Sequence, residues 1–155
     1  MSAWEGLEFE LSRLHSYFCN DPDGDAITEY GSGRIFRDRI DILSRKADSY
    51  FVGHCSQTKE ARFSEIVRVA THLSGTRNDI AHGIVMDVSG IQHFVQTIKL
   101  IEKGIPQYLL VPPIHTIRKH INGLPEYALN SKQLKLFAKT TIDFFQSVAQ
   151  FRKSL

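Results

Sequence analysis

Apolar residues recur at intervals of three and four along several stretches of this chain, which is the spacing of an amphipathic helix. The first stretch predicts a helix over about residues 3–18, whose core-facing stripe consists of Trp4, Leu7, Leu11, Leu14 and Phe18. Similar patterns predict long helices over about residues 34–52, from residue 57 or 59 to 82, and over 131–152. The chain is therefore expected to be mainly α-helical.

The first predicted helix is followed by the turn-forming segment Asn20-Asp21-Pro22-Asp23-Gly24-Asp25. Its alternating aspartates resemble the start of a calcium loop. An EF-hand, however, requires Gly at its sixth position and Glu at its twelfth, where this chain has Ala26 and Ser32. We therefore exclude a calcium loop and expect a short helix that ends near Tyr30, with Pro22 in its first turn.

The helical pattern is interrupted between residues 84 and 129. Residues 84–88 and 108–111 each read as a short strand, and Pro112-Pro113 stops the second. Residues 91–101 fit a helix or a strand, and the turn before them favours a hairpin. We expect an irregular or β-containing insertion, with a possible small β-hairpin, before the C-terminal helix.

Length and composition fit one globular domain over residues 1–155. The chain has 155 residues, of which 42% are hydrophobic and 23% charged. We therefore expect a single helical bundle of four to five helices. The net charge of +2 permits a nucleic-acid partner without requiring one.

Nothing in the sequence predicts a membrane or secretory protein. It has no apolar run near the ~20 residues that a spanning helix needs, and acidic residues occupy the N-terminus in place of a signal peptide. Cys19 and Cys55 are expected to stay reduced in a cytoplasm. His15 lies four residues before Cys19, but without a second pair nearby we expect core and flank residues rather than a metal site. No metal or other cofactor is predicted.

The most reactive set of side chains closes the helix that ends at residue 82, in the segment Arg77-Asn78-Asp79-Ile80-Ala81-His82-Gly83. Asn78 and His82 are one turn apart and share a helix face, whereas Arg77 lies about 140° round from His82. Only a long side chain such as Arg curls back from there. Gly83 is expected to end the helix in a left-handed conformation, and Gly75 is expected to mark a close approach by another helix.

This set of side chains suits phosphate chemistry. The guanidinium of Arg77 offers a fork of donors, and the imidazole of His82 exchanges a proton near neutral pH. The alternative is a solvated helix end, in which basic residues only interact favourably with the helix dipole.

The segment resembles the Arg-polar-x-x-x-His signature of HEPN domains, with Asn78 in the polar position. HEPN domains are compact helical bundles that commonly dimerise. Many are metal-independent endoribonucleases of toxin–antitoxin, abortive-infection and CRISPR effector systems, and others are catalytically silent binding modules. The resemblance implies that Arg77, Asn78 and His82 from two protomers form one composite site. Some HEPN toxins carry a Tyr two residues after the His that a partner enzyme modifies; Ile84 stands there, so this regulation is not expected.

Three functions follow from these features. The first is a dimeric endoribonuclease in a cytoplasmic toxin or phage-defence role, with RNA as substrate and an antitoxin or defence protein as a possible partner. The second is a silent module that binds RNA, a nucleotide or a protein. The third is a helical interaction domain in which the motif only closes a helix. The basic run that includes Arg118, Lys119 and His120 is a candidate RNA contact, with an exposed loop as the alternative.

Overall fold

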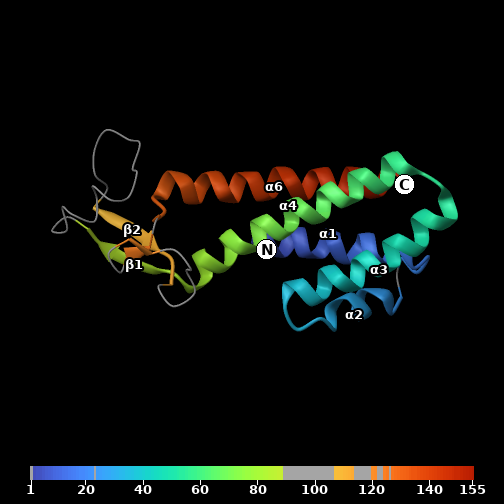
Figure 1. Cartoon of the computed structure of the whole chain (residues 1–155), viewed down its shortest axis with the longest axis horizontal. Helices are drawn as coiled ribbons and strands as arrows, with labels where there is room; N and C mark the ends of the chain where they lie inside the picture. Colours follow the sequence, from blue (N-terminus) through green and yellow to red (C-terminus); the bar gives the residue numbers. More distant parts are fainter. Residues whose placement is uncertain (1, 23, 89–106, 114–119, 122–123, 126) are drawn as a thin grey trace. The chain divides into compact units, whose positions relative to one another are not determined.

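The computed structural model describes residues 2–22, 24–88, 107–113, 120–121, 124–125 and 127–155 (Figure 1). The chain divides into two compact units. Unit 1 comprises Met1–Ser74 and Ala138–Leu155, and unit 2 comprises Gly75–Phe137. Helices α4 and α6 each contribute residues to both units.

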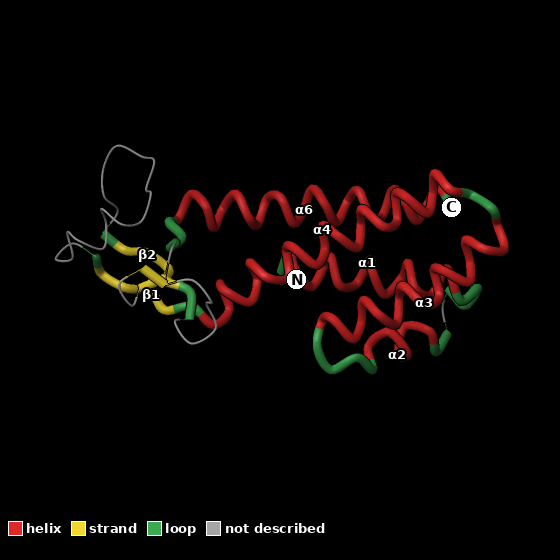
Figure 2. Tube along the Cα trace, viewed as in Figure 1, coloured by secondary structure: helices red, strands yellow, loops and turns green. Residues whose placement is uncertain are grey.

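The described part of the chain is mainly helical, with a small antiparallel pair of strands before the C-terminal helix (Figure 2), so the predicted fold class is confirmed. The helices are α1 (Ala3–Phe18), α2 (Ala26–Gly31), α3 (Phe36–His54), α4 (Gln57–His82) and α6 (Ser131–Ser154). The strands are β1 (Ile84–Asp87), β2 (Tyr108–Val111), β3 (His120–Ile121) and β4 (Leu124–Pro125). None of the described helices has an apolar stretch long enough to span a membrane.

The core of unit 1 forms around the apolar stripe of α1. Leu7, Leu11 and Leu14 are completely buried. Phe18 then packs edge-on against Phe51 of α3 and Phe63 of α4, with ring centroids 5.5 and 5.4 Å apart. The stripe read from the sequence is thus the face that joins α1 to its neighbours.

Two helix starts differ from the prediction. Helix α2 begins at Ala26, not in the turn that contains Pro22, and the Ala26 backbone N–H donates to Asp21 Oδ2 at 3.1 Å. Helix α3 begins at Phe36 rather than near residue 34. Ile35, an apolar residue within the predicted range 34–52, is the N-cap of α3 and is 59% exposed.

A buried ion pair joins α1 to the end of α6 within unit 1. Glu10 is only 4% exposed, although it is acidic. Its Oε2 accepts a hydrogen bond from Arg152 Nε at 3.1 Å, and its Oε1 accepts one from Arg13 Nη1 at 3.3 Å. These two cations compensate a carboxylate that burial would otherwise destabilise.

Unit 2 is built on an antiparallel sheet of β1 and β2, whose register pairs Ile84 with Val111 and Asp87 with Tyr108. A small core lies beside it, formed by Val88, Leu109, Val111 and Ala128. The predicted strands thus pair with each other. Residues 91–101, for which a hairpin was favoured, lie outside the described residues.

Helix α6 begins with a reciprocal cap. The Gln133 N–H donates to Asn130 Oδ1 at 2.9 Å, and the Asn130 N–H donates to Gln133 Oε1 at 2.8 Å. This pair satisfies two helix-end donors and fixes the predicted start at residue 131. Burial on α6 does not follow apolar character alone, since the apolar Ile142 is 44% exposed and the polar Thr141 is fully buried.

Candidate functional site

The candidate motif lies at the C-terminal end of helix α4, and His82 is the last residue of that helix. The helix runs without a break from Gln57 to His82, so the predicted helix end is confirmed. The expected close approach at Gly75 is not found within the described chain, where a Cβ added at this residue would meet nothing within 4 Å.

The expected left-handed stop at Gly83 is wrong, because its φ lies outside that region. A Cβ at this position would instead lie 2.7 Å from the backbone oxygen of Asp79 and 3.0 Å from that of Val111. Glycine is therefore favoured first by the Asp79 carbonyl in the last turn of α4 itself, and next by the approach of Val111 of β2. Both contacts lie within unit 2.

The structure brings Arg77 and Asn78 together. Nη1 of Arg77 donates to Oδ1 of Asn78 at 3.3 Å, which turns the guanidinium towards the face that Asn78 shares with His82. Arg77 is half-buried, whereas Asn78 and His82 are exposed. Among the described residues, no hydrogen bond joins His82 to either side chain. The structure thus brings Arg77 and Asn78 into contact, but it does not bring the His82 side chain into contact with either of them.

Asp79 is held by a partner that the sequence did not reveal. Its Oδ2 accepts a short hydrogen bond from the hydroxyl of Tyr127. Burial and the Asp79 carboxylate raise the pKa of Tyr127 above the usual range of a tyrosine. Tyr127 lies far along the chain in an irregular segment, so no local pattern could have indicated it. No carboxylate in the described part of the chain forms an ion pair with Arg77.

The second predicted site is not tested. Arg118 and Lys119 lie outside the described residues. The backbone of His120 belongs to β3, but its side chain is also outside the described part.

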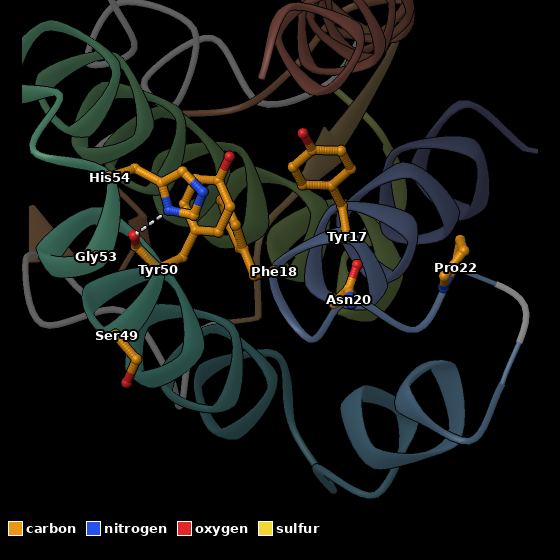
Figure 3. A pocket seen from close by; sticks show the side chains of 8 residues that line it. All are labelled: Tyr17, Phe18, Asn20, Pro22, Ser49, Tyr50, Gly53 and His54. Carbon is orange, nitrogen blue, oxygen red and sulfur yellow. Dashed lines mark hydrogen bonds between the residues drawn. The ribbon is translucent and has the colours of Figure 1, made fainter.

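Unit 1 contains a separate pocket of about 650 Å³ (Figure 3). One wall is a stack of Tyr50 on His54, with centroids 4.0 Å apart, and His54 Nδ1 donates to the Tyr50 carbonyl at 2.8 Å. The lining residues are Tyr17, Phe18, Asn20, Pro22, Ser49, Tyr50, Gly53 and His54. This lining holds no Lys, no Arg and no residue of the motif, so it fits an apolar or aromatic group better than a phosphate.

A cluster with metal-binding potential lies elsewhere in unit 1. His15 and Cys19, expected to be core and flank residues, are joined by Glu29 of α2. His15 is fully buried and Cys19 partly buried. Burial lowers the pKa of His15 and raises that of Cys19, and so favours the neutral form of both.

Comparison with known proteins gave no match, whether with protein-family models, with curated proteins or with solved structures.

Proposed function

We propose that this protein is a metal-independent endoribonuclease of HEPN type, with a composite site formed by Arg77, Asn78 and His82 of two copies. The support is the motif itself together with its setting. It closes a long helix in a mainly helical fold, as in the family that the sequence resembles.

The observation that carries the proposal is the contact between Arg77 and Asn78. It turns the guanidinium towards the side of the helix that presents His82, one turn further on. Asp79 accepts from Tyr127, and Arg77 forms no ion pair with a described carboxylate, which supports an anion as its partner. A cation, an amide and an exposed imidazole on one surface suit the binding of a phosphodiester.

RNA supplies the nucleophile for this chemistry. The ribose 2′-oxygen attacks the adjacent phosphorus while the bond from phosphorus to the 5′-oxygen breaks, which leaves a 2′,3′-cyclic phosphate. One His82 accepts the proton of the 2′-hydroxyl, and a second protonates the leaving 5′-oxygen. Arg77 stabilises the charge that develops on the phosphate oxygens. Since one imidazole cannot be base and acid in the same step, two protomers are required.

The resemblance also supplies the proposed setting, a toxin or antiviral defence protein that a partner protein restrains or activates. DNA lacks the 2′-hydroxyl and is expected to be spared. The alternative is a silent module that uses the same surface to bind RNA, a nucleotide or a protein.

The test is an RNA cleavage assay in excess EDTA. Arg77→Ala and His82→Ala are each expected to reduce cleavage by about 10²-fold or more. His72→Ala is the matched control, because His72 is another exposed histidine of α4. It should cleave like wild type. Circular dichroism in EDTA and light scattering verify the fold and the dimer of each variant.

Each outcome separates the candidate functions. Chelator-resistant cleavage that is lost only in the two motif variants, with cyclic-phosphate ends, supports the nuclease. Cleavage that is unchanged in both variants refutes this site. RNA binding without cleavage, weakened by Arg77→Ala, replaces the nuclease by the binding module.

A further inference from the structure

Three side chains that commonly bind transition metals meet between α1 and α2 within unit 1. Nε2 of His15 lies 3.7 Å from Cys19 Sγ and 3.7 Å from Glu29 Oε2. The ligand atoms of all three residues lie within 4.8 Å of one another. His15 and Cys19 are one helical turn apart on α1, and the short helix α2 brings Glu29 to them.

The backbone orients the imidazole for this role. Nδ1 of His15 lies 2.9 Å from the carbonyl oxygen of Ala26. A carbonyl only accepts hydrogen bonds, so Nδ1 carries the proton and Nε2 keeps its lone pair. Cys19 Sγ lies 3.7 Å from Nε2 and 3.9 Å from Nδ1, and Nε2 is also the nitrogen that lies 3.7 Å from Glu29 Oε2. Metal-binding histidines are typically held in this way, with the second ring nitrogen donating to a carbonyl or a carboxylate.

We propose that His15 Nε2, Cys19 Sγ and Glu29 Oε2 bind one divalent transition-metal ion. Zn²⁺ is the ion that fits these ligands best. Tetrahedral zinc with bonds of about 2.0–2.3 Å separates its ligand atoms by about 3.5 Å. The two pairs that involve His15 are close to this value, and since the three ligand atoms lie within 4.8 Å of one another, Cys19 and Glu29 need only a small inward shift to bind one ion. Nitrogen and sulfur ligands favour zinc over calcium or magnesium. A water molecule takes the fourth position. The Cys19 thiol loses its proton to solvent as the zinc–sulfur bond forms.

Lys46 opposes this site and gives it a specific test. Its Nζ lies 3.6 Å from Glu29 Oε1, the carboxylate oxygen that the ion does not use. A nearby ammonium disfavours a cation electrostatically. Replacing Lys46 with glutamine is therefore expected to tighten metal binding.

The competing account needs no ion. In it the Cys19 thiol donates a hydrogen bond to His15 Nε2, and Glu29 pairs only with Lys46. This arrangement satisfies the buried imidazole equally well. It predicts no cobalt–thiolate bond and no effect of Lys46 on metal affinity.

The test uses the full chain, freed of metal and without an affinity tag, titrated with Co²⁺ and then with Zn²⁺. We expect one ion per chain and a thiolate-to-cobalt charge-transfer absorption that zinc abolishes. Cys19→Ser should remove this absorption. Cys55→Ser is the matched control, because Cys55 is exposed and lies outside the cluster. It should keep the absorption.

Substitutions at two partly exposed residues, Glu29 and Lys46, test the proposal even if changes at the buried His15 prevent folding. Glu29→Gln should weaken binding at least about tenfold, and Lys46→Gln should strengthen it. Absence of the absorption in wild type, or its persistence in Cys19→Ser, overturns the site. Unchanged affinity in both Glu29→Gln and Lys46→Gln also overturns the three-ligand assignment. None of these measurements depends on RNA cleavage, so they test the metal site separately from the nuclease.

Discussion

Replacing Glu10 by alanine is expected to be among the most destabilising single changes in unit 1. The Glu10 carboxylate is 4% exposed and accepts from Arg152, whose side chain is only 15% exposed. Glu10→Ala leaves that guanidinium largely desolvated and without its counter-ion. Removing one partner of a buried pair costs about 3–5 kcal/mol, which is a large part of the stability of an ordinary domain.

The two partners are expected to differ. Arg152→Ala leaves Glu10 with a second cation, since Arg13 Nη1 remains 3.3 Å from the carboxylate. Its cost should therefore be smaller, about 1–3 kcal/mol. The double variant should cost less than the sum of the single changes, because the second substitution removes the charge that the first one leaves unpaired.

Urea denaturation followed by circular dichroism measures these free energies, provided that the slope with denaturant stays constant. The control is Glu65→Ala. Glu65 pairs with Arg68 at 2.6 Å, closer than Glu10 with Arg152, but both of these side chains on α4 are well exposed. Solvent screens such pairs, so no clear loss is expected. If Glu10→Ala proves no more destabilising than Glu65→Ala, the argument from burial is refuted.

Two further predictions concern unit 2. Gly83→Ala should cost about 1–3 kcal/mol in the same urea assay, because its Cβ overlaps neighbouring backbone oxygens. Gly75→Ala, in open space inside a helix, should gain up to about 1 kcal/mol, and the opposite order would contradict the packing argument. The pKa of Tyr127 is higher in the folded chain than the value of about 10 for an unfolded tyrosine. The hydrogen bond of Tyr127 therefore contributes its full free energy of stabilisation well below pH ~10, and this contribution is lost as the pH rises above that value. In an absorbance titration, Tyr127→Phe should remove the ionisation of one tyrosine above pH ~10, and Asp79→Asn should lower the pH at which that tyrosine ionises. If the ionisation that Tyr127→Phe removes lies at or below pH ~10, the raised pKa of Tyr127 is contradicted.

The long helices were predictable because their evidence is local. In α1 the three- and four-residue spacing holds over the whole segment, and the structure has the predicted bounds, Ala3–Phe18. The start of α3 was missed because Ile35 continues the apolar pattern although it precedes the helix. Periodicity shows which apolar residues recur at helical spacing, but it does not show which residue is the N-cap of the helix.

Contacts between distant segments could not be predicted. The burial of Glu10 is explained by Arg13, three residues away, together with Arg152, which is 142 positions away and could not be identified from the local pattern. Similarly, Gly83 suggested a left-handed helix stop, whereas the structure shows a crowded position between the Asp79 carbonyl of α4 and Val111 of β2.

The candidate sites follow the same division between local and distant information. The residues Arg77, Asn78 and His82 were recognisable as a motif within one helix end. The partner of Asp79 was not, because Tyr127 comes from an irregular segment. The cluster of His15 and Cys19 gained its third member, Glu29, from a different helix.

The pairing of Glu10 with Arg152 also has a consequence for biosynthesis, since the two residues are 142 positions apart. At about 5–20 residues per second, a ribosome adds Arg152 roughly 7–28 s after Glu10. During that interval α1 emerges with a carboxylate that only Arg13 can neutralise. The contact between α1 and α6 within unit 1 therefore forms only after synthesis has reached α6, and the α1 face around Glu10 cannot be completed before then.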